Sequence, residues 1–261
     1  MAVINLDPAN DGYRYECFAD VGELVSLDAV QEETGLGPNG GLVYCLEYLE
    51  ANLDWLEGKV RELQREDRYV LFDLPGQVEL WSNHGSLRRI VDRLGRQGHV
   101  RLCTVNLVDS LLCTDVPKFV SALLLSLSGM LHVELPHVNV LSKCDLVARY
   151  DAPGFSLSRF LECRDLSSLA GLLDSGAFSD KYRRLTQEIC EAVDDYGLVD
   201  FLPLAVEDPS SLGAVLASVH EANGFAYKPA PGGAPGGVGL RDRAAHSLGL
   251  YGPGAGETGG Q

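Results

Sequence analysis

The chain has 261 residues, 46% of them hydrophobic, which is enough apolar material for a sizeable globular core. A formal net charge of −16 without any lysine- or arginine-rich run argues against binding nucleic acid through its phosphates. Seven cysteines without paired spacing predict reduced thiols, as in the cytoplasm, and we expect neither a secretion signal nor a membrane span.

Short apolar runs alternate with segments of helical periodicity. Buried strands are predicted over residues 3–6, 69–72, 102–108, 138–141 and 201–204, and helices over 42–63, 79–94, 117–131 and 182–196. Continuous apolar strands separated by helices are typical of a parallel sheet with helices on both faces. We therefore expect one α/β domain over 1–227, irregular structure over 151–180, and a disordered tail rich in glycine and proline over 228–261.

The first motif, Asp73-Leu74-Pro75-Gly76-Gln77, follows a predicted strand. In P-loop nucleotide hydrolases an aspartate at this position meets the magnesium shell, and the turn after it approaches the terminal phosphate. Gly76 would let the backbone come close to a phosphate, and the Gln77 amide would orient an attacking water. A tight turn that only closes a strand–helix unit is the structural alternative.

The second motif, Ser142-Lys143-Cys144-Asp145, also follows a predicted strand and resembles the guanine-binding pattern [NT]-K-x-D, with serine at the first position. The Asp145 carboxylate could accept two hydrogen bonds from the N1 and N2 donors that guanine has and adenine lacks, while the stem of Lys143 packs along the base. A turn with a solvated lysine and aspartate is the alternative. Both motifs at strand ends of one pattern favour a nucleotide site.

Two further segments carry candidate residues. Asp7 ends the first predicted strand and precedes Pro8, so its carboxylate could face a metal-bound phosphate or simply close a turn. The segment 35–41 matches G-x-G-x-x-G, but a polar, helix-like stretch precedes it in place of a strand. A dinucleotide-dependent oxidoreductase is therefore a distant alternative.

The order and spacing of these motifs resemble the GPN-loop GTPases, a family named for the tripeptide found here as Gly37, Pro38 and Asn39. The match covers residues 3 to about 227 and includes Asn5-Leu6-Asp7-Pro8-Ala9. Segments 21–25, 48–55 and 131–137 look most like one particular member of that family.

The resemblance implies GTP hydrolysis with Mg²⁺ in a homodimer, or in a heterodimer with another GPN-loop GTPase. Asn39 would then act across the dimer, while Asp7, Asp73 and Gln77 act within their own subunit, with Asp73 and Asp7 as magnesium residues. It also implies a cytoplasmic protein that shuttles to the nucleus. Its expected partners are RNA polymerase II and III subunits or their assembly factors, without direct contact to nucleic acid or membrane.

One family element has no counterpart, because the sequence contains no G-x-x-x-x-G-K-[ST] phosphate loop. We expect a chain truncated at its N-terminus, without the first strand, the phosphate loop and the first helix of the fold. The missing strand would lie beside the strand of Asp73, so its loss would expose two strand edges. Two interpretations stay open: a GTPase, or a non-catalytic short form that acts as a dimerisation and interaction protein.

Overall fold

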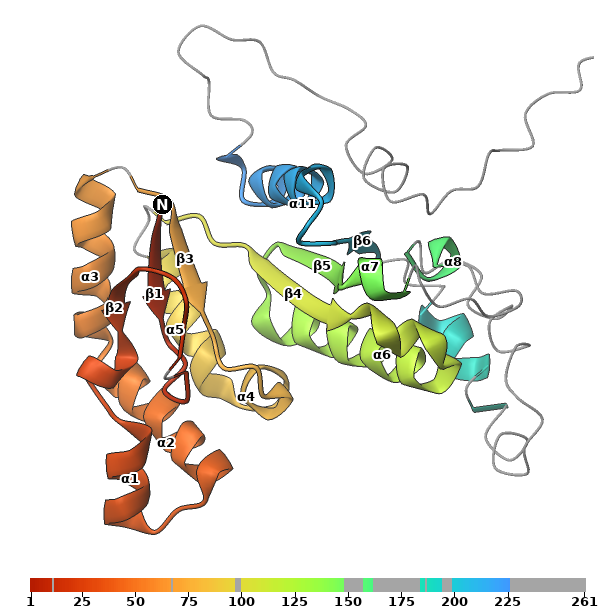
Figure 1. Ribbon diagram of the computed structural model, residues 1–261. Helices are drawn as coiled ribbons and strands as arrows, with labels where there is room; N and C mark the ends of the chain where they lie inside the picture. Colours follow the sequence, from red (N-terminus) through yellow and green to blue (C-terminus); the bar gives the residue numbers. More distant parts are fainter. Residues whose placement is uncertain are drawn as a thin grey trace, which may run out of the picture. The chain divides into compact units, whose positions relative to one another are not determined.

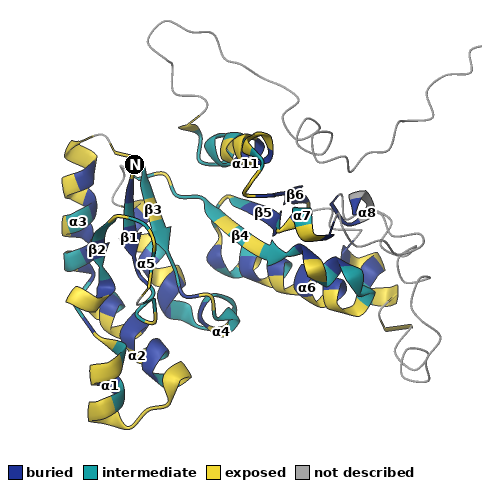
Figure 2. Cartoon of the chain, viewed as in Figure 1, coloured by how far each residue is buried: buried dark blue, intermediate teal, exposed yellow. Residues whose placement is uncertain are grey.

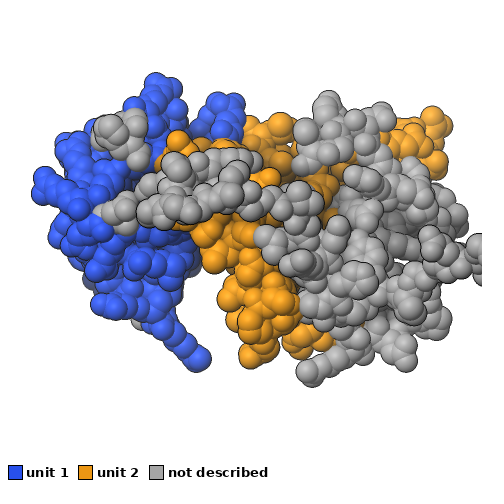
Figure 3. All heavy atoms as spheres, turned by 90° about the horizontal axis from the view of Figure 1, so that it is seen from above, with its two compact units in different colours: residues 1–100, 132–134 blue, residues 101–131, 135–261 orange. Residues whose placement is uncertain are grey.

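The computed structural model describes residues 1–10, 12–66, 68–96, 100–147, 157–161, 184–185, 187–193 and 199–225. The described chain forms two compact units, one of residues 1–100 with 132–134 and the other of 101–131 with 135–261 (Figures 1 and 3). Each contains a three-stranded parallel sheet, with strand order β2-β1-β3 in the first unit and β4-β5-β6 in the second. The expected α/β class with parallel strands is thereby confirmed.

The first unit is built around the central strand β1. Its strands are β1 (Ala2–Asn5), β2 (Cys17–Asp20) and β3 (Val70–Asp73). Its helices are the 3₁₀ turn η1 (Val21–Glu23), α1 (Leu27–Thr34), α2 (Pro38–Ala51), α3 (Leu53–Arg65), α4 (Val78–Ser82) and α5 (Gly85–Arg96).

The predicted helix over 42–63 is two helices, because the backbone leaves the helical region at Asn52. The apolar stripe continues through the break, with Leu49, Leu53 and Leu56 all buried, and therefore gave no sign of it. The predicted helix over 79–94 is likewise divided into α4 and α5, with Asn83 as the C-cap of α4.

Ion pairs join α5 to α2 and α3. Arg89 bonds Glu50 of α2, and Arg93 bonds Glu57 of α3 at 2.8 Å. Glu57 is only 4% exposed, and Arg61 Nη2 contacts its other oxygen at 3.1 Å. These contacts fix the helix pair that begins at the Gly-Pro-Asn segment.

The second unit places helices on both faces of its sheet. Its strands are β4 (Thr104–Asp109), β5 (His137–Ser142) and β6 (Phe201–Pro203). Its helices are the 3₁₀ turn η2 (Ser110–Thr114), α6 (Val116–Val133, whose last two residues group with the first unit), α7 (Cys144–Val147), α8 (Ser158–Leu161) and α11 (Pro209–Ala222). Residues 184–185 and 187–193 are also helical, and the rest of the predicted helix 182–196 lies outside the described residues.

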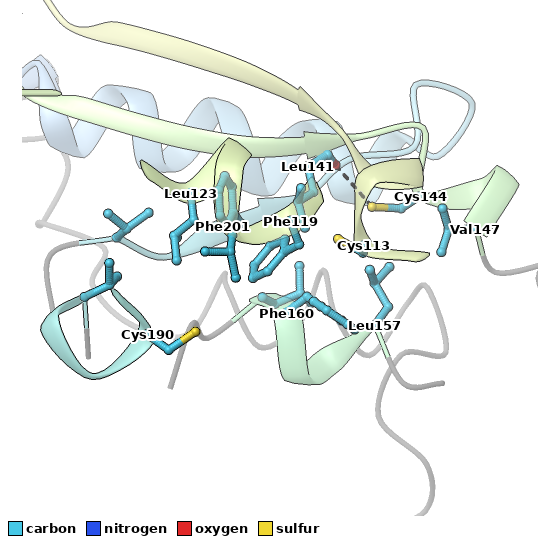
Figure 4. Packing of buried hydrophobic residues seen from close by; sticks show 14 residues of the cluster. Cys113, Phe119, Leu123, Leu141, Cys144, Val147, Leu157, Phe160, Cys190 and Phe201 are labelled. Atoms are coloured by element: carbon cyan, nitrogen blue, oxygen red, sulfur yellow. Dashed lines mark hydrogen bonds between the residues drawn. The ribbon is translucent and has the colours of Figure 1, made fainter. Parts of the chain in front are cut away.

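Alternate residues of β5 and β6 face opposite layers. Phe119 and Leu123 of α6 pack with Leu141 and Phe201 in one cluster, which Figure 4 shows from close by. Val140, Leu202 and other residues form a second cluster with Val215 of α11. Both faces of this sheet are thus covered, as its continuous apolar strands predicted.

Helix α6 is long and apolar enough to cross a membrane by length and composition alone, with 39% of that window buried. Core helices of soluble proteins pass the same test, and Phe119, Val120 and Leu123 of α6 are buried in the cluster of Figure 4. Its other residues include the exposed Leu124, Leu125 and Leu131. Figure 2 shows buried and exposed stretches along α6.

Strands β3 and β4 each lie at the outside of their sheet among the described residues. Leu71 of β3 is 42% exposed, and Val105 and Leu107 of β4 are 41% and 63% exposed. Both strands therefore carry exposed apolar side chains. The predicted irregular segment 151–180, apart from residues 157–161, and the predicted tail 228–261 lie outside the described residues.

Candidate functional site

The ends of β1 and β3 bring Asp7 and Asp73 to the same edge of the first sheet. Asn5 pairs with Asp73 in the parallel register, and the Leu6 amide donates to the Asp73 carbonyl at 2.8 Å. Asn5 is 1% exposed; its side-chain amide donates to the Asp7 carbonyl and to Asp20 Oδ2, and its oxygen accepts from the Asp7 amide. This buried amide fixes the backbone where Asp7 leaves the strand.

Asp7 has the turn geometry that its proline neighbour suggested. Its Oδ1 accepts a hydrogen bond from the Ala9 amide at 2.9 Å, and its carbonyl accepts one from the Asn10 amide at 3.2 Å. The turn alternative is therefore realised for this oxygen. The carboxylate nevertheless remains only partly buried at the strand end.

Two side chains from the loop after β1 contact the Asp73 carboxylate. The Tyr15 hydroxyl donates to Asp73 Oδ2 at 2.6 Å, and Asn10 Nδ2 donates to the same oxygen at 3.1 Å. Burial, followed by the hydrogen bond to Asp73, raises the pKa of Tyr15 well above its usual value, so the phenol stays protonated as a donor. Sequence reasoning missed both residues.

The turn after β3 contains Gly76 and Gln77. A Cβ atom at Gly76 would meet no other atom within 4 Å, so packing within the described chain does not require glycine there. Gln77 is the N-cap residue of α4, and its Oε1 is buried without a hydrogen-bond partner among the described residues. A buried amide oxygen of this kind calls for a donor from outside the described residues.

The Gly-Pro-Asn segment forms the beginning of α2. Gly37 is the N-cap residue, Pro38 occupies the first helical position, and Asn39 follows in the first turn. Gly37, Pro38 and Asn39 are all exposed, and within the described chain the Asn39 amide makes no hydrogen bond. Gly41 is closely packed, because a Cβ there would come within 2.7 Å of Leu27 Cδ1.

The second motif lies at the end of β5 in the other unit. Ser142 Oγ donates to the Val108 carbonyl at 3.1 Å, which ties the serine to the neighbouring strand. Lys143 has a positive φ of 60°, and its Nζ donates to Asp109 Oδ2 at 2.7 Å. Asp145 lies in the first turn of α7.

Both carboxylate oxygens of Asp109 accept hydrogen bonds. Its Oδ1 accepts from the Leu111 amide at 2.9 Å, which caps η2, while Oδ2 holds Lys143. Burial pushes the pKa of Asp109 upward, but the hydrogen bonds from Lys143 and Leu111 outweigh it and keep the pKa below its usual value. By contrast, the Asp145 carboxylate accepts no hydrogen bond from the described residues.

The predicted residues thus form separate groups. Asp7, Asp73, Gly76 and Gln77 lie on the strand ends of the first unit and the turn after them, and Asn39 lies at the start of α2 in that same unit. Ser142, Lys143 and Asp145 lie together at a strand end of the second unit.

Comparisons with known proteins place these motifs in context. Residues 1–225 match a family model described as a conserved hypothetical ATP binding protein. The chain is 48% identical over 227 residues to GPN-loop GTPase QQT1 of Arabidopsis thaliana, covering 87% of this chain and 76% of that protein. It is 49% identical over 227 residues to GPN-loop GTPase 2 of Danio rerio, covering 87% and 72%.

A solved structure shares the fold. The apo form of a GTPase from Pyrococcus abyssi superposes with a TM-score of 0.64 over 85% of both chains, at 22% identity. This likeness gives the class of the fold, an α/β protein with parallel strands and helices. The chain belongs to the GPN-loop GTPase family. Relatives named GPN-loop GTPase 2 match it over most of its length, as segments 21–25, 48–55 and 131–137 indicated.

Proposed function

We propose that this protein takes part in GTP hydrolysis within a dimer of GPN-loop GTPases. Asp145 would bind the guanine base beside Lys143, Gln77 would orient the attacking water, and Asn39 would contact the phosphates bound by the opposite subunit. The open Asp145 carboxylate beside an anchored lysine is the observation that carries the proposal.

The geometry of this motif favours guanine over the adenine named by the family description. Ser142 and Lys143 are engaged by Val108 and Asp109, whereas Asp145 makes no hydrogen bond to the described chain. A free carboxylate suits the two adjacent donors of guanine, and adenine offers no matching pair. A site that must pair with a base donor discriminates strongly against a base that lacks it.

The end of the first sheet has oxygen donors that fit Mg²⁺. Asp7 and Asp73 follow neighbouring strands, and Asp73 Oδ1 accepts no hydrogen bond from the described residues. Mg²⁺ commonly takes one or two protein carboxylates and completes its shell with water and phosphate oxygens. A Mg²⁺ ion bound together with GTP would offset the negative charge on the phosphates. Gln77 Oε1, buried and unpartnered in the described chain, can accept a hydrogen bond from a water held nearby and so orient it.

Asn39 suits a role across a dimer. Its amide is exposed at the first turn of α2 and has no hydrogen-bond partner among the described residues. An amide can donate to a phosphate oxygen without adding charge, and the N-terminal end of a helix favours anions. A Cβ atom at Gly37 would meet no other atom within 4 Å, so the backbone there leaves room for a phosphate to approach closely.

A second candidate function rests on the sequence. The 261 residues contain no G-x-x-x-x-G-K-[ST] element, so the backbone cradle, lysine and hydroxyl that grip the phosphates are not supplied by these residues. A chain of this kind can dimerise without binding GTP and act as an interaction protein.

Calorimetry separates the two functions. We expect the 261-residue chain to bind no Mg²⁺–GTP, and a chimera with a strand, a G-x-x-x-x-G-K-[ST] loop and a helix fused before Met1 to bind and hydrolyse GTP. Asp145→Asn in the chimera should weaken the binding of GTP but not the binding of ATP. A chimera that folds but binds neither nucleotide would leave only the interaction function, and micromolar GTP binding by the unmodified chain would contradict the need for the loop.

For the cellular role we propose assistance to the assembly or nuclear localisation of RNA polymerase II or III, supported only by the family resemblance. The net charge of −16 favours contact with polymerase subunits or assembly factors as proteins. Retention of polymerase subunits in the cytoplasm after depletion of the protein would support this role, and normal nuclear import would argue against it.

A further inference from the structure

The Asp73 carboxylate is held on one side only. Among the described residues, Tyr15 and Asn10 are the side chains that donate to it, and both donate to Oδ2. The distance of 2.6 Å between the Tyr15 hydroxyl and Oδ2 is in the range of short hydrogen bonds to charged oxygens. Two donors on one oxygen fix the rotation of the carboxylate and leave Oδ1 unengaged by the described chain.

The loop that carries these donors is itself anchored. The Asn10 amide donates to the Asp7 carbonyl at 3.2 Å, and Asn10 Nδ2 also lies 3.4 Å from the Tyr15 hydroxyl. The ring of Tyr15 stacks on that of Tyr13, with centroids 4.8 Å apart and planes 16° from parallel. Tyr15 therefore reaches Asp73 from a restrained position.

We propose that Tyr15 is a positioning residue, whose hydroxyl turns Asp73 so that Oδ1 is presented to a divalent cation. The inference rests on the proposed function, in which Asp73 belongs to the shell of the cation that accompanies GTP. Side chains that hydrogen-bond a metal-ligating carboxylate set its orientation, and their loss typically lowers metal affinity about 10- to 100-fold. Tyr15 acts through Asp73 and need not touch the nucleotide.

The test uses the 261-residue chain and Mn²⁺ alone as the probe. Mn²⁺ is titrated into the wild type and into Tyr15→Phe, and paramagnetic broadening of the Leu74 and Gly76 amide resonances reports binding next to Asp73. We expect the midpoint for Tyr15→Phe to be higher by roughly 10-fold, since the ring remains but the donor is lost. Thermal melting checks that the variant is folded.

Tyr13→Phe is the matched control. It removes a phenol hydroxyl two positions away, from a ring that stacks on Tyr15. The interaction of this hydroxyl is with Asp20, which raises the pKa of Tyr13 to about 12, so the midpoint should equal that of the wild type. Asn10→Ala removes the second donor and should raise the midpoint in the same direction, which keeps the test valid if Tyr15→Phe is unstable.

Equal midpoints for the wild type and the folded Tyr15→Phe or Asn10→Ala variants would overturn the inference. Absence of broadening at Leu74 and Gly76 in the wild type would also overturn it. Failure of the chimera to bind GTP would refute the proposed function while leaving a shifted Mn²⁺ midpoint in place, so the two failures are distinguishable.

Discussion

The pair between Arg93 and the buried Glu57 should be the strongest electrostatic support of the helices behind the Gly-Pro-Asn segment. In Arg93→Met the Glu57 carboxylate, which is 4% exposed, loses one cation and keeps its contact with Arg61 at 3.1 Å. Breaking a fully buried pair costs about 3–5 kcal/mol. Because the side chain of Arg93 is 50% exposed and Arg61 remains, we expect a loss of about 2 kcal/mol.

Differential scanning calorimetry measures this loss as a lower Tm. For a chain of this size about 2 kcal/mol corresponds to roughly 4–8 °C. Arg96→Met is the matched control, since its pair with Asp92 is exposed on both sides and should contribute about 0.5 kcal/mol or less.

The double variant Glu57→Met with Arg93→Met tests the cause. It removes the buried charge together with its partner, so most of the lost stability should return. Equal Tm shifts for Arg93→Met and Arg96→Met would refute the idea that burial of Glu57 makes its pair with Arg93 the stronger one. A double variant less stable than Arg93→Met would show that removing a cation from the buried Glu57 carboxylate is not the cause of the lost stability.

Three further changes test the site and the fold. In the GTP-binding chimera, Asn39→Ala should lower turnover at least tenfold with nearly unchanged GTP affinity; weaker affinity with normal turnover would contradict action across the dimer. In the same chimera, Asp109→Asn releases Lys143 and should reduce the affinity for GDP about 3- to 10-fold, measured by competition with a fluorescent analogue. Unchanged affinity would mean that the ion pair between Asp109 and Lys143 is purely structural. Burial lowers the pKa of His137 from 6.5 to about 4, so its neutral form stabilises the fold above pH 6.5 and this contribution is lost as the pH falls toward 4. In urea unfolding at about pH 7 and pH 4.5, His137→Phe should remove about 2 kcal/mol of that pH dependence, and an unchanged dependence would contradict it.

The periodicity of the sequence was sufficient to locate five strands, but the predicted burial was wrong for two of them, because β3 and β4 contain no buried residue. Strands β1, β3, β4, β5 and β6 lie at or within two residues of the predicted ranges, because each is a compact apolar run next to helical segments. Strand β2 escaped prediction, since Cys17–Asp20 is four residues long with only Ala19 buried. Helix α11 was missed although Asp208 as N-cap and Pro209 at the first helical position are recognisable signals.

The candidate site was predicted only where motifs are local. Asp73, Gln77, Lys143 and Asp145 follow strands as expected, because a strand end fixes the position of the next few residues. The contact between Tyr15 and Asp73 joins residues 58 positions apart, and no spacing rule connects them. The role of Asp109 as the partner of Lys143 depends in the same way on the register of β4 with β5.

The exposed outer strand β4 has a consequence for the behaviour of the protein in solution. On the side away from β5, its backbone groups pair with no strand among the described residues. Together with the exposed Val105 and Leu107 they offer an edge on which a strand of another molecule can add. The net charge of −16 repels neighbouring copies, but that repulsion weakens as added salt shortens the Debye length to about 3 Å at 1 M. Self-association should therefore increase with ionic strength, contrary to the usual practice of adding salt to keep a protein dispersed.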